Sequence, residues 1–407
     1  MRVLLLMQWF DPEPTFKGLA FAKQLVQNGH EVEVLTAFPN YPEGKLYPGY
    51  RLRIWQREVV DGISVIRVPL YPSHDGSSVR RALNYVSFAL SSALLGPWLV
   101  RPADVVYVYH APGTIALPAM ALKALRGMPF VYDINDLWPD SLPATGMLNN
   151  RVLLKCVDLW SRLTYRLASH VVIGSPGVKR VLQERGVPES KVTVIFNWCD
   201  EAQLLQTEHR ISPTDEPDMA ERFNVVFAGN MGKAQALDAV LAAAELIASR
   251  LEYVQFVFIG GGVDVARLKR LKDERGLTNV LFLPRRPMSE IGSALKLAGA
   301  LLVHLRDDPL FRITLPSKTQ AYLAVGRPIL MAVRGDAAEL VENADGGIVC
   351  SPENAESIAA GVEELARMRP EELQEMGKRG ERYYWRELSL LVGTRRFEHV
   401  FSNAMNG

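Results

Sequence analysis

Short runs of β-branched and aromatic residues alternate with longer helical runs along nearly the whole chain, in two successive blocks. The first block has apolar runs at 3–8, 31–37, 63–71, 104–110, 129–135 and 170–175, and the second has them at 223–230, 254–262, 280–284, 300–305 and 328–333. Strands that alternate with helices form βαβ units around a parallel sheet. The sequence therefore predicts an α/β fold with two doubly wound domains, which we expect to face each other across a cleft.

The length of the chain favours the same division. A single hydrophobic core stops growing at about 250–300 residues, and this chain has 407. The alternation stops at 191–221, a polar stretch with prolines and several acidic residues, and it restarts at 223. We expect domains at 1–198 and 199–385, with a C-terminal helix at about 386–407 that packs back on the first domain.

Charge and cysteine content exclude several classes of protein. The chain has 46 basic and 45 acidic residues, for a net charge of +1, whereas a nucleic-acid partner calls for a broad basic face. Cys156, Cys199 and Cys350 lie far apart and form no CxxC or Cys/His cluster, which predicts neither disulfides nor a zinc site. The N-terminal apolar run is too short for a signal sequence and is predicted to be a buried strand. A reducing, cytoplasmic location fits these features.

One stretch, 82–100, has no charged residue and follows the pair Arg80 and Arg81. It contains Asn84, three serines and a Gly-Pro pair, which disfavour a membrane-spanning helix. Two interpretations are preferred to a span. The helix either packs on the sheet, or lies as a peripheral element on the inner face of the cell membrane with both arginines at the headgroups.

Ligands of doubly wound sheets bind at the carboxyl ends of the strands, so the residues after each strand are candidates for the site. In the first block, Gly18 precedes a helix and His110 ends a strand, where we expect a functional rather than a structural histidine. The segment DLWPDS then brings Asp136 and Asp140 close to Asp133. Two interpretations of these carboxylates remain open: they orient sugar hydroxyls, or Asp136 caps the next segment.

Glycine-rich loops follow the first two strands of the second block, in GNMGKAQ and IGGG. Glycine lets a backbone approach a phosphate closely, and helix N-termini present free N–H groups. Lys233 lies in the first of these loops. Neither loop matches G-x-G-x-x-G, so the sequence argues against a dinucleotide-dependent hydride-transfer enzyme.

A second cation, Lys318, lies at the start of a helix in TLPSKTQAYLAVG. The preceding proline rigidifies the entry, Ser317 is expected to cap the helix, and Gly326 is expected to end it. A lysine at this position adds a full charge to the positive end of the helix dipole. We predict that it binds a diphosphate; the alternative is a structural helix with a solvated lysine.

Several motifs occur in a fixed order along nearly the whole chain: HAP, DLWPDS, GNMGKAQ, IGGG, and PSK followed by YLA and GRPIL. Together they resemble the family 4 glycosyltransferases of the GT-B fold, which has two Rossmann-like domains, and in particular the bacterial branch similar to fucosamine, colanic-acid and O-antigen sugar transferases. The resemblance implies a hexosyltransferase that moves a sugar with retention from a UDP-sugar, such as a UDP-N-acetylhexosamine. It assigns the donor to the C-terminal half and a glycan or lipid-linked acceptor to the N-terminal half.

The resemblance also implies roles for single residues. It matches His110, Lys318 and Lys233 to functional residues of the family. The predicted catalytic residues are His110, Lys318 and Asp136. The predicted donor-binding residues are Gly229, Asn230, Gly232, Lys233, Gly261, Arg286, Ser317 and Gln320, and those on the acceptor side are Gly18, Asp133 and Asp140. The two positions of the family's E-x7-E pair fall on Ile313 and Ala321, which are not acidic. Ribose recognition is therefore expected to differ from that of the family, with Gln320 as a candidate substitute.

We expect no metal ion and no cofactor, because lysines and helix N-termini supply the positive charge that a departing nucleoside diphosphate needs. The pair Asp307-Asp308 lacks the D-x-D spacing of many metal-dependent transferases. Two other functions remain open. One is a nucleotide-sugar 2-epimerase of the same architecture, and the other is a nucleotide-sugar-binding protein without turnover, which Ala321 favours.

Overall fold

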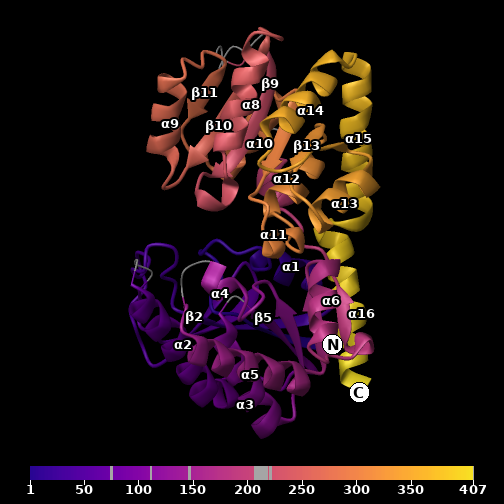
Figure 1. Cartoon of the computed structure of the whole chain (residues 1–407). Coiled ribbons are helices and arrows are strands. Elements are labelled where there is room, and N and C mark those ends of the chain that lie inside the picture. The colour runs from indigo at the N-terminus through magenta and orange to yellow at the C-terminus, as the bar shows by residue number, and fades with distance from the viewer. Residues whose placement is uncertain (74–76, 111, 145–147, 206–218, 220–221, 407) are drawn as a thin grey trace. The chain divides into compact units, whose positions relative to one another are not determined.

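A computed structural model describes residues 1–73, 77–110, 112–144, 148–205, 219 and 222–406. The chain forms two compact units, one made of Met1–Phe196 and Gly393–Gly407 and the other of Asn197–Val392 (Figure 1). Ala111 of the HAP motif and part of the stretch between the two alternating blocks, at 206–218 and 220–221, lie outside the described residues.

The first unit contains an eight-stranded sheet in the order β3-β4-β2-β1-β5-β6-β7-β8. Every neighbouring pair is parallel except β3 and β4. The strands are β1 (Arg2–Leu6), β2 (Glu31–Ala37), β3 (Gln56–Val60), β4 (Ile63–Val68), β5 (Val105–His110), β6 (Phe130–Ile134), β7 (His170–Ile173) and β8 (Val192–Val194). The carboxyl ends of β1, β5 and β6 therefore lie side by side at one edge.

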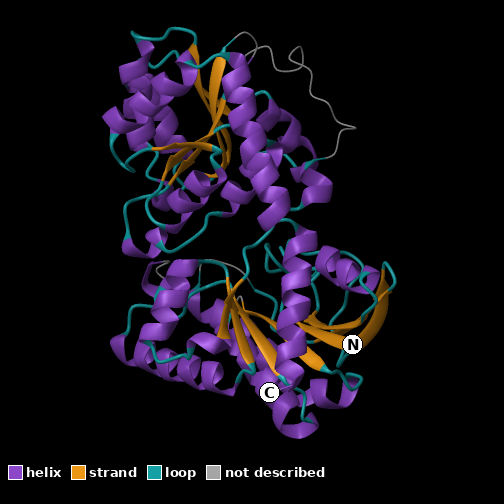
Figure 2. Ribbon diagram, turned by 90° about the vertical axis from the view of Figure 1, so that its right-hand side faces the viewer, coloured by secondary structure: helices purple, strands orange, loops and turns teal. Residues whose placement is uncertain are grey.

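Helices cover both faces of this sheet (Figures 1 and 2). On one face α3 packs against both α2 and α5; on the other, Phe21 of α1 and Phe397 of α16 meet Tyr107 of β5 with ring centroids 5.3–5.4 Å apart. The helices are α1 (Leu19–Gln27), α2 (Ser78–Leu99), α3 (Ala116–Arg126), α4 (Ser141–Ala144), α5 (Arg151–Leu167), α6 (Pro176–Glu184) and α16 (Leu390–Asn406), with 3-10 turns η1 (Gly113–Ile115) and η2 (Glu189–Lys191).

The second unit contains a six-stranded parallel sheet in the order β11-β10-β9-β12-β13-β14. Its strands are β9 (Phe223–Asn230), β10 (Val254–Gly261), β11 (Val280–Leu283), β12 (Ala300–His304), β13 (Ile329–Ala332) and β14 (Gly347–Val349). The order reverses at β9, the point in such a sheet where ligands bind. The predicted α/β class with two doubly wound domains is thus confirmed.

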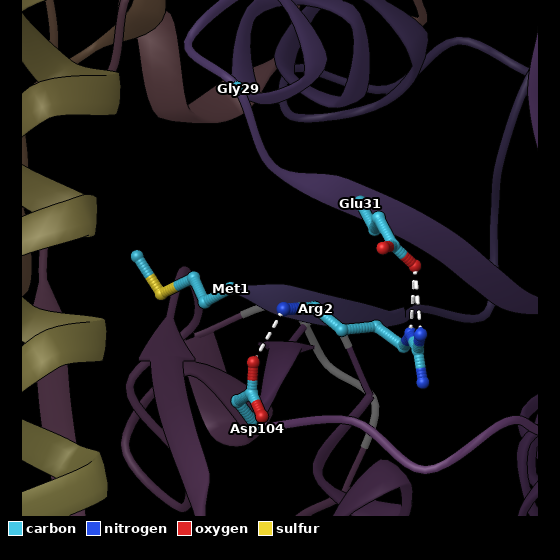
Figure 3. A pocket seen from close by; sticks show the side chains of 5 residues that line it. All are labelled: Met1, Arg2, Gly29, Glu31 and Asp104. Atoms are coloured by element: carbon cyan, nitrogen blue, oxygen red, sulfur yellow. Dashed lines mark hydrogen bonds and ion pairs between the residues drawn. The ribbon is translucent and has the colours of Figure 1, made fainter.

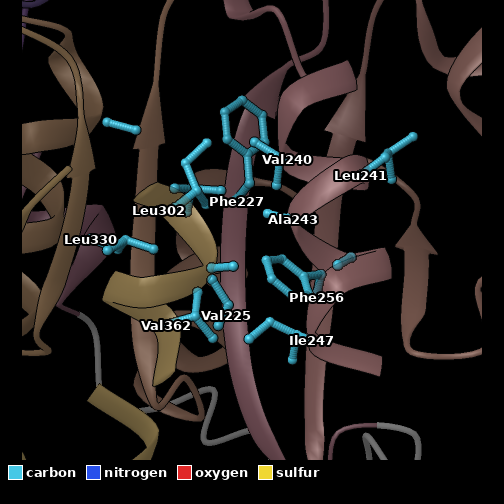
Figure 4. Packing of buried hydrophobic residues seen from close by; sticks show 14 of the residues in the cluster. Val225, Phe227, Val240, Leu241, Ala243, Ile247, Phe256, Leu302, Leu330 and Val362 are labelled. Atoms are coloured by element: carbon cyan, nitrogen blue, oxygen red, sulfur yellow. The ribbon is translucent and has the colours of Figure 1, made fainter. Parts of the chain in front are cut away.

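The helices of the second unit also lie on both faces of their sheet (Figure 2). They are α7 (Glu201–Leu204), α8 (Asp238–Ala248), α9 (Val265–Glu274), α10 (Met288–Lys296), α11 (Pro309–Arg312), α12 (Ser317–Val325), α13 (Asp336–Ala344), α14 (Ala355–Arg367) and α15 (Pro370–Glu387), with the 3-10 turn η4 (Lys233–Gln235). Figure 4 shows Phe227 and Leu302 of the sheet packed with Val240 of α8 and Val362 of α14. This apolar layer fixes the strands whose ends carry the glycine loops.

Three short strands were not predicted. β3 pairs antiparallel at the edge of its sheet and alternates only weakly, β8 lies inside the stretch predicted to separate the domains, and β14 has three residues. Edge strands bury one face at most and carry a weak apolar pattern. The longer central strands were predicted well, and Glu31–Ala37 and Phe223–Asn230 have the predicted bounds.

Helix α2 contains all of the uncharged stretch 82–100 except Val100, which caps its C-terminus, and it starts four residues earlier than that stretch. Ser77 caps it by accepting a hydrogen bond from the backbone of Arg80. No helix in the described part of the chain is long and apolar enough to cross a membrane. A spanning helix at 82–100 is therefore excluded, while the two other interpretations remain.

Candidate functional site

The predicted donor-binding residues of the second unit gather at the carboxyl ends of three neighbouring strands. Gly229 and Asn230 end β9, Gly261 ends β10, and Arg286 follows β11. In the register of the sheet, Gly261 pairs with Asn230. The order of the strands thus brings glycines from two loops and one arginine to a single edge.

Positive φ angles, and at one position a close backbone approach, explain two of the glycines at this edge. Gly260 has a φ of +145°, and a Cβ atom built there would lie 2.1 Å from the carbonyl oxygen of Gly229. Gly229 has a φ of +135°, and a Cβ atom there would lie 3.6 Å from Lys318 Nζ. L side chains rarely adopt these angles. The two loops therefore expose main chain beside a lysine.

Lys318 brings a second cation to this edge, and its ammonium group is buried. Nζ is buried, has no hydrogen-bond partner among the described residues, and lies 3.5 Å from the centroid of the Phe227 ring. Burial lowers the pKa of Lys318 to about 7. A buried cation without a partner costs stability, which is typical of a group that meets an anionic ligand.

The start of α12 differs from the prediction. Ser317 is exposed and gives no side-chain cap, because the helix begins at Ser317 itself and Pro316 occupies the N-cap position. The prediction that Ser317 caps the helix was wrong. With its amide oriented to suit its neighbours, Gln320 Nε2 donates to the carbonyls of Pro316 (2.9 Å) and Ser317 (3.0 Å). A contact of this amide with ribose would require these bonds to break.

The end of α12 agrees with the prediction. Gly326 adopts the left-handed conformation at φ +74° and terminates the helix. Ala321, one turn after Lys318, is half-buried and offers no polar group. The carboxylate that the family resemblance places here has no equivalent at this position.

Lys233 is exposed at the start of η4, which is a single three-residue turn rather than the start of α8. The backbone N–H of Gly232 donates to Gln235 Oε1 at 3.0 Å and closes the turn. The ammonium group of Lys233 is thus at the surface of the loop that follows β9. Its predicted contact with phosphate stays a prediction.

His304, at the end of β12, was missed by the sequence analysis. Its Nδ1 donates to the carbonyl of Gln235 (2.6 Å), and its Nε2 accepts from the backbone N–H of Glu353 (3.0 Å). Burial lowers the pKa of His304, so it is neutral in this arrangement. It joins the loops after β9 and β14, and its place at a strand end is the same signal that singled out His110.

His110 ends β5 in the first unit. The ring is 2% exposed and lies between Tyr132 (5.1 Å between centroids) and Trp138 (5.9 Å). Its Nδ1 has no hydrogen-bond partner in the described part of the chain. Burial lowers the pKa of His110 to about 3, so the imidazole is neutral at physiological pH.

Gly113 leaves the space that the His110 ring needs. A Cβ atom at Gly113 would lie 2.8 Å from Trp138 Cε3 and 3.3 Å from His110 Nε2. A side chain at this position would displace one ring or the other. The glycine of the HAPG segment therefore fixes the position of the histidine.

Asp133 lies near the end of β6, Asp136 and Asp140 follow the strand, and the three carboxylates have different environments. Asp133 is 1% exposed, and its Oδ2 accepts from Lys17 Nζ and from the Tyr107 hydroxyl, both at 2.6 Å. Asp140 forms an ion pair with Arg185. Asp136 is exposed, and the protein atoms packed around it raise its pKa. Of the three carboxylates, that of Asp136 is the best placed to meet a ligand.

Gly18 is buried at the N-cap of α1. A Cβ atom there would lie 2.3 Å from Thr15 Cγ2 and 2.4 Å from Asp11 Oδ2. Asp11 Oδ2 accepts from the backbone N–H of Leu19 at 2.8 Å. Gly18 thus lets the loop after β1 fold tightly onto the helix, and its role toward an acceptor stays a prediction.

A shallow pocket lies at the opposite edge of the first sheet, where the strands begin (Figure 3). The backbone N–H of Arg2 donates to Asp104 Oδ2 at 2.6 Å, and its guanidinium pairs with Glu31 at 2.9 Å. The charged groups of this pocket satisfy one another. It is therefore a weaker candidate for the site than the strand ends.

Comparisons with known proteins identify the family to which the chain belongs. The model of the glycosyl transferase 4-like domain matches residues 19–198, and that of glycosyl transferases group 1 matches residues 214–383. Together with the two doubly wound units, these matches show that the chain belongs to the family 4 glycosyltransferases of the GT-B fold, in their bacterial branch. It is a glycosyltransferase.

Particular relatives make the comparison more specific. The putative colanic acid biosynthesis glycosyl transferase WcaI of Escherichia coli is 28% identical over 381 residues, which cover 89% of this chain and 91% of that protein. The probable glycosyltransferase WbjE of Pseudomonas aeruginosa is 22% identical over 272 residues, covering 66% of this chain and 67% of that protein.

Solved structures share the fold. The crystal structure of Anabaena HepE in complex with UDP-glucose is 14% identical with a TM-score of 0.68, and the match covers 99% of each chain. The trehalose 6-phosphate synthase of Burkholderia multivorans has a TM-score of 0.72 at 13% identity, with 100% of this chain and 97% of that one covered.

Proposed function

We propose that this glycosyltransferase moves a sugar from a UDP-sugar, such as a UDP-N-acetylhexosamine, to a glycan or lipid-linked acceptor in the synthesis of a cell-surface polysaccharide. HepE is described in complex with UDP-glucose, and WcaI is named for colanic acid biosynthesis. The donor binds to the second unit and the acceptor to the first. Retention of configuration follows the family resemblance.

The environment of Lys318 is the main support for donor binding in the second unit. Its ammonium group has no hydrogen-bond partner among the described residues and lies beside the exposed main chain of Gly229. A diphosphate at this edge supplies the missing anion. It also raises the pKa of Lys318 from about 7, since an opposite charge favours the protonated form.

The same geometry suits the chemistry of transfer. As the glycosidic bond breaks, negative charge grows on the leaving diphosphate, and fixed donors aimed at that charge lower the barrier. Lys318 supplies a positive charge, and the glycine loops after β9 and β10 supply main-chain N–H groups. In the first unit, the neutral ring of His110 can exchange hydrogen bonds with a sugar without adding charge around it.

A membrane-facing role for α2 belongs to the same proposal, since lipid-linked acceptors reside at a membrane. Six exposed apolar side chains recur every three or four residues along α2 and form a single stripe: Val79, Leu83, Val86, Leu90, Leu94 and Trp98. Leu94 is 70% and Trp98 83% exposed. A helix that only packs on the sheet leaves no such stripe in water.

The charge of this helical layer fits an anionic lipid surface. Helices α2, α3 and α5 contain eight basic residues, Arg80, Arg81, Lys123, Arg126, Arg151, Lys155, Arg162 and Arg166, and one acidic residue, Asp158. The whole chain, by contrast, has a net charge of only +1. Basic residues around an apolar stripe strengthen binding to anionic lipids, and we place the protein at the inner face of the cell membrane.

The non-acidic residues Ile313 and Ala321 favour one other function, a nucleotide-sugar-binding protein without turnover. Incubation with a panel of UDP-sugars and saccharide acceptors separates the possibilities. The proposed transferase releases UDP and forms a new glycoside only when an acceptor is present. Binding of UDP-sugars without any product identifies the binding protein, and an isomerised donor identifies a 2-epimerase.

A further inference from the structure

Three aromatic rings from distant parts of the first unit meet at the carboxyl ends of β1 and β2. Trp9 follows β1, Tyr41 follows β2, and Tyr85 lies in α2. The ring centroids of Trp9 and Tyr41 are 4.7 Å apart at an interplanar angle of 31°, and those of Trp9 and Tyr85 are 6.3 Å apart at 70°. Trp9 and Tyr41 are half-buried, so both keep part of their surface in solvent. We call these three residues the aromatic cluster.

A buried chain of amides holds the aromatic cluster. Each member follows an amide residue directly: Gln8 precedes Trp9, Asn40 precedes Tyr41 and Asn84 precedes Tyr85. Each of the three amide residues is 1% exposed. Gln8 Nε2 donates to Asn84 Oδ1 at 2.6 Å, and Asn84 Nδ2 donates to Asn40 Oδ1 at 3.1 Å.

One buried carboxylate joins two of the same segments. Glu13, 2% exposed, accepts from the backbone N–H groups of Asn40 and Tyr41 through Oε1 (both 2.8 Å) and from that of Phe10 through Oε2 (3.2 Å). Phe10 follows Trp9 directly. Burying amides and a carboxylate is costly unless they form hydrogen bonds. Here the hydrogen bonds between these groups hold the rings in a fixed arrangement.

Two charged side chains act electrostatically on Tyr85, and one of them, Arg81, precedes it by one turn of α2. Burial raises the pKa of Tyr85; the charge of Arg81 opposes this, and that of Asp136 adds to it. Both charged side chains therefore act on the cluster. Asp136 is exposed, and Arg81 Nε has no hydrogen-bond partner among the described residues. A carboxylate that accepts and a guanidinium that donates match hydroxyl groups, which do both.

We propose that the aromatic cluster is the acceptor subsite and that it stacks against the C–H face of a pyranose ring, with Asp136 and Arg81 toward the sugar hydroxyls. Aromatic faces are electron-rich and attract polarised C–H bonds. Ligand sites combine such apolar surface with a few fixed polar groups. The proposal rests on the proposed glycosyl transfer and names the chemistry of its acceptor side.

Saturation-transfer NMR with the methyl glycosides of glucose, galactose and fucose tests this subsite in the full-length protein. We expect saturation of the ring C–H protons of at least one glycoside. Its affinity should fall about 3- to 10-fold in Trp9→Ala, the range for loss of one aromatic contact, and recover in Trp9→Phe. Trp385→Ala, which removes an exposed tryptophan of the second unit, should leave the affinity unchanged.

UDP binding, measured by thermal shift on the same variants, separates this proposal from the proposed function. We expect UDP to stabilise the wild type, Trp9→Ala and Trp9→Phe equally, which also shows that the variants are folded. Equal saturation in the wild type and Trp9→Ala would overturn the subsite, and so would the absence of saturation in a wild type that UDP stabilises. A protein that UDP does not stabilise would overturn the donor side instead.

Discussion

The ammonium group of Lys318 is buried against the ring of Phe227 and has no hydrogen-bond partner in the described part of the chain. Such a group weakens the folded protein when no ligand is bound, since its charge is neither solvated nor paired. A diphosphate removes this penalty on binding. Stability and donor binding therefore place opposite demands on this single residue.

Replacing Lys318 with methionine should separate these demands. We expect Lys318→Met to lower kcat/KM by roughly 10² to 10³, the cost of losing a charged contact in the transition state. The melting temperature should rise by about 2–4 °C because a buried cation is removed. Steady-state kinetics and calorimetry check both effects. Lys296→Met, at an exposed position of α10, is the matched control and should change neither.

The difference in melting temperature between Lys318→Met and the wild type should depend on pH, with a definite sign. The folded pKa of Lys318 is about 7 and the ordinary value is 10.5, so the unfolded chain binds more protons between these values and stability rises with pH there. The gap in melting temperature between Lys318→Met and the wild type should be largest below pH 7 and narrow toward pH 10. A gap that does not change with pH, or an unchanged kcat/KM, would contradict the assignment.

At the scale of elements, α2 has two sides of different character. Its inner side carries Asn84 and Phe88, which are buried, and its outer side carries the exposed apolar stripe from Val79 to Trp98. Gly96 fits this packing closely, because a Cβ atom there would lie 2.9 Å from Leu35 Cδ2. The interpretation of 82–100 as a helix packed on the sheet describes the inner side, and the proposed membrane contact concerns the outer side.

A double change in the outer stripe tests the membrane role of α2. The wild type should sediment with vesicles that contain phosphatidylglycerol, and Leu90→Glu/Leu94→Glu should stay in solution, since two carboxylates in the stripe oppose both apolar insertion and the anionic surface. Val59→Glu adds a carboxylate at a 72% exposed position of β3 and should still sediment. Equal sedimentation of the double variant would return α2 to a purely structural role.

At the scale of the whole molecule, contacts between residues far apart in the sequence hold the second unit together. The Tyr384 hydroxyl of α15 donates to Glu201 Oε1 (2.8 Å) and accepts from the backbone N–H of Cys199 (3.2 Å). Glu201 Oε1 also accepts from the backbone of Leu390. The first residues of this unit are thereby tied to its last helix.

We expect Tyr384→Phe to lower the free energy of unfolding by about 1–3 kcal/mol, because Glu201 and Cys199 lose their partner in a buried setting. Urea denaturation measures this loss.

In the native wild type, Cys156 is exposed, whereas burial raises the pKa of the Cys199 and Cys350 thiols to about 12. One thiol in three should therefore react quickly with a disulfide reagent. A second thiol should react faster in Tyr384→Phe than in Tyr71→Phe. Equal rates in the two variants would contradict the role of the Tyr384 hydroxyl in holding the first residues of this unit to its last helix.

Sequence patterns predicted the local structure around the candidate residues better in the second unit than in the first. The glycines after β9 and β10, Lys318 and Gly326 depend on backbone angles and helix ends, which are local properties that a short motif carries. His304 carried the same strand-end signal as His110 and was missed. In the first unit, the cluster of three aspartates suggested a common role. Only the structure shows that Asp133 is held by Lys17, which is 116 residues away.

The sequence by itself determined the α/β class, the two blocks, most central strands and the helix that carries Lys318, because hydrophobic periodicity and turn residues act over a few positions. Tertiary structure alone decided which side chains meet. It left Lys318 without a hydrogen-bond partner among the described residues, and it paired Asp133 with Lys17. It also joined Trp9, Tyr41 and Tyr85 above a layer of amides. Such contacts depend on the order and register of strands, which no local pattern specifies.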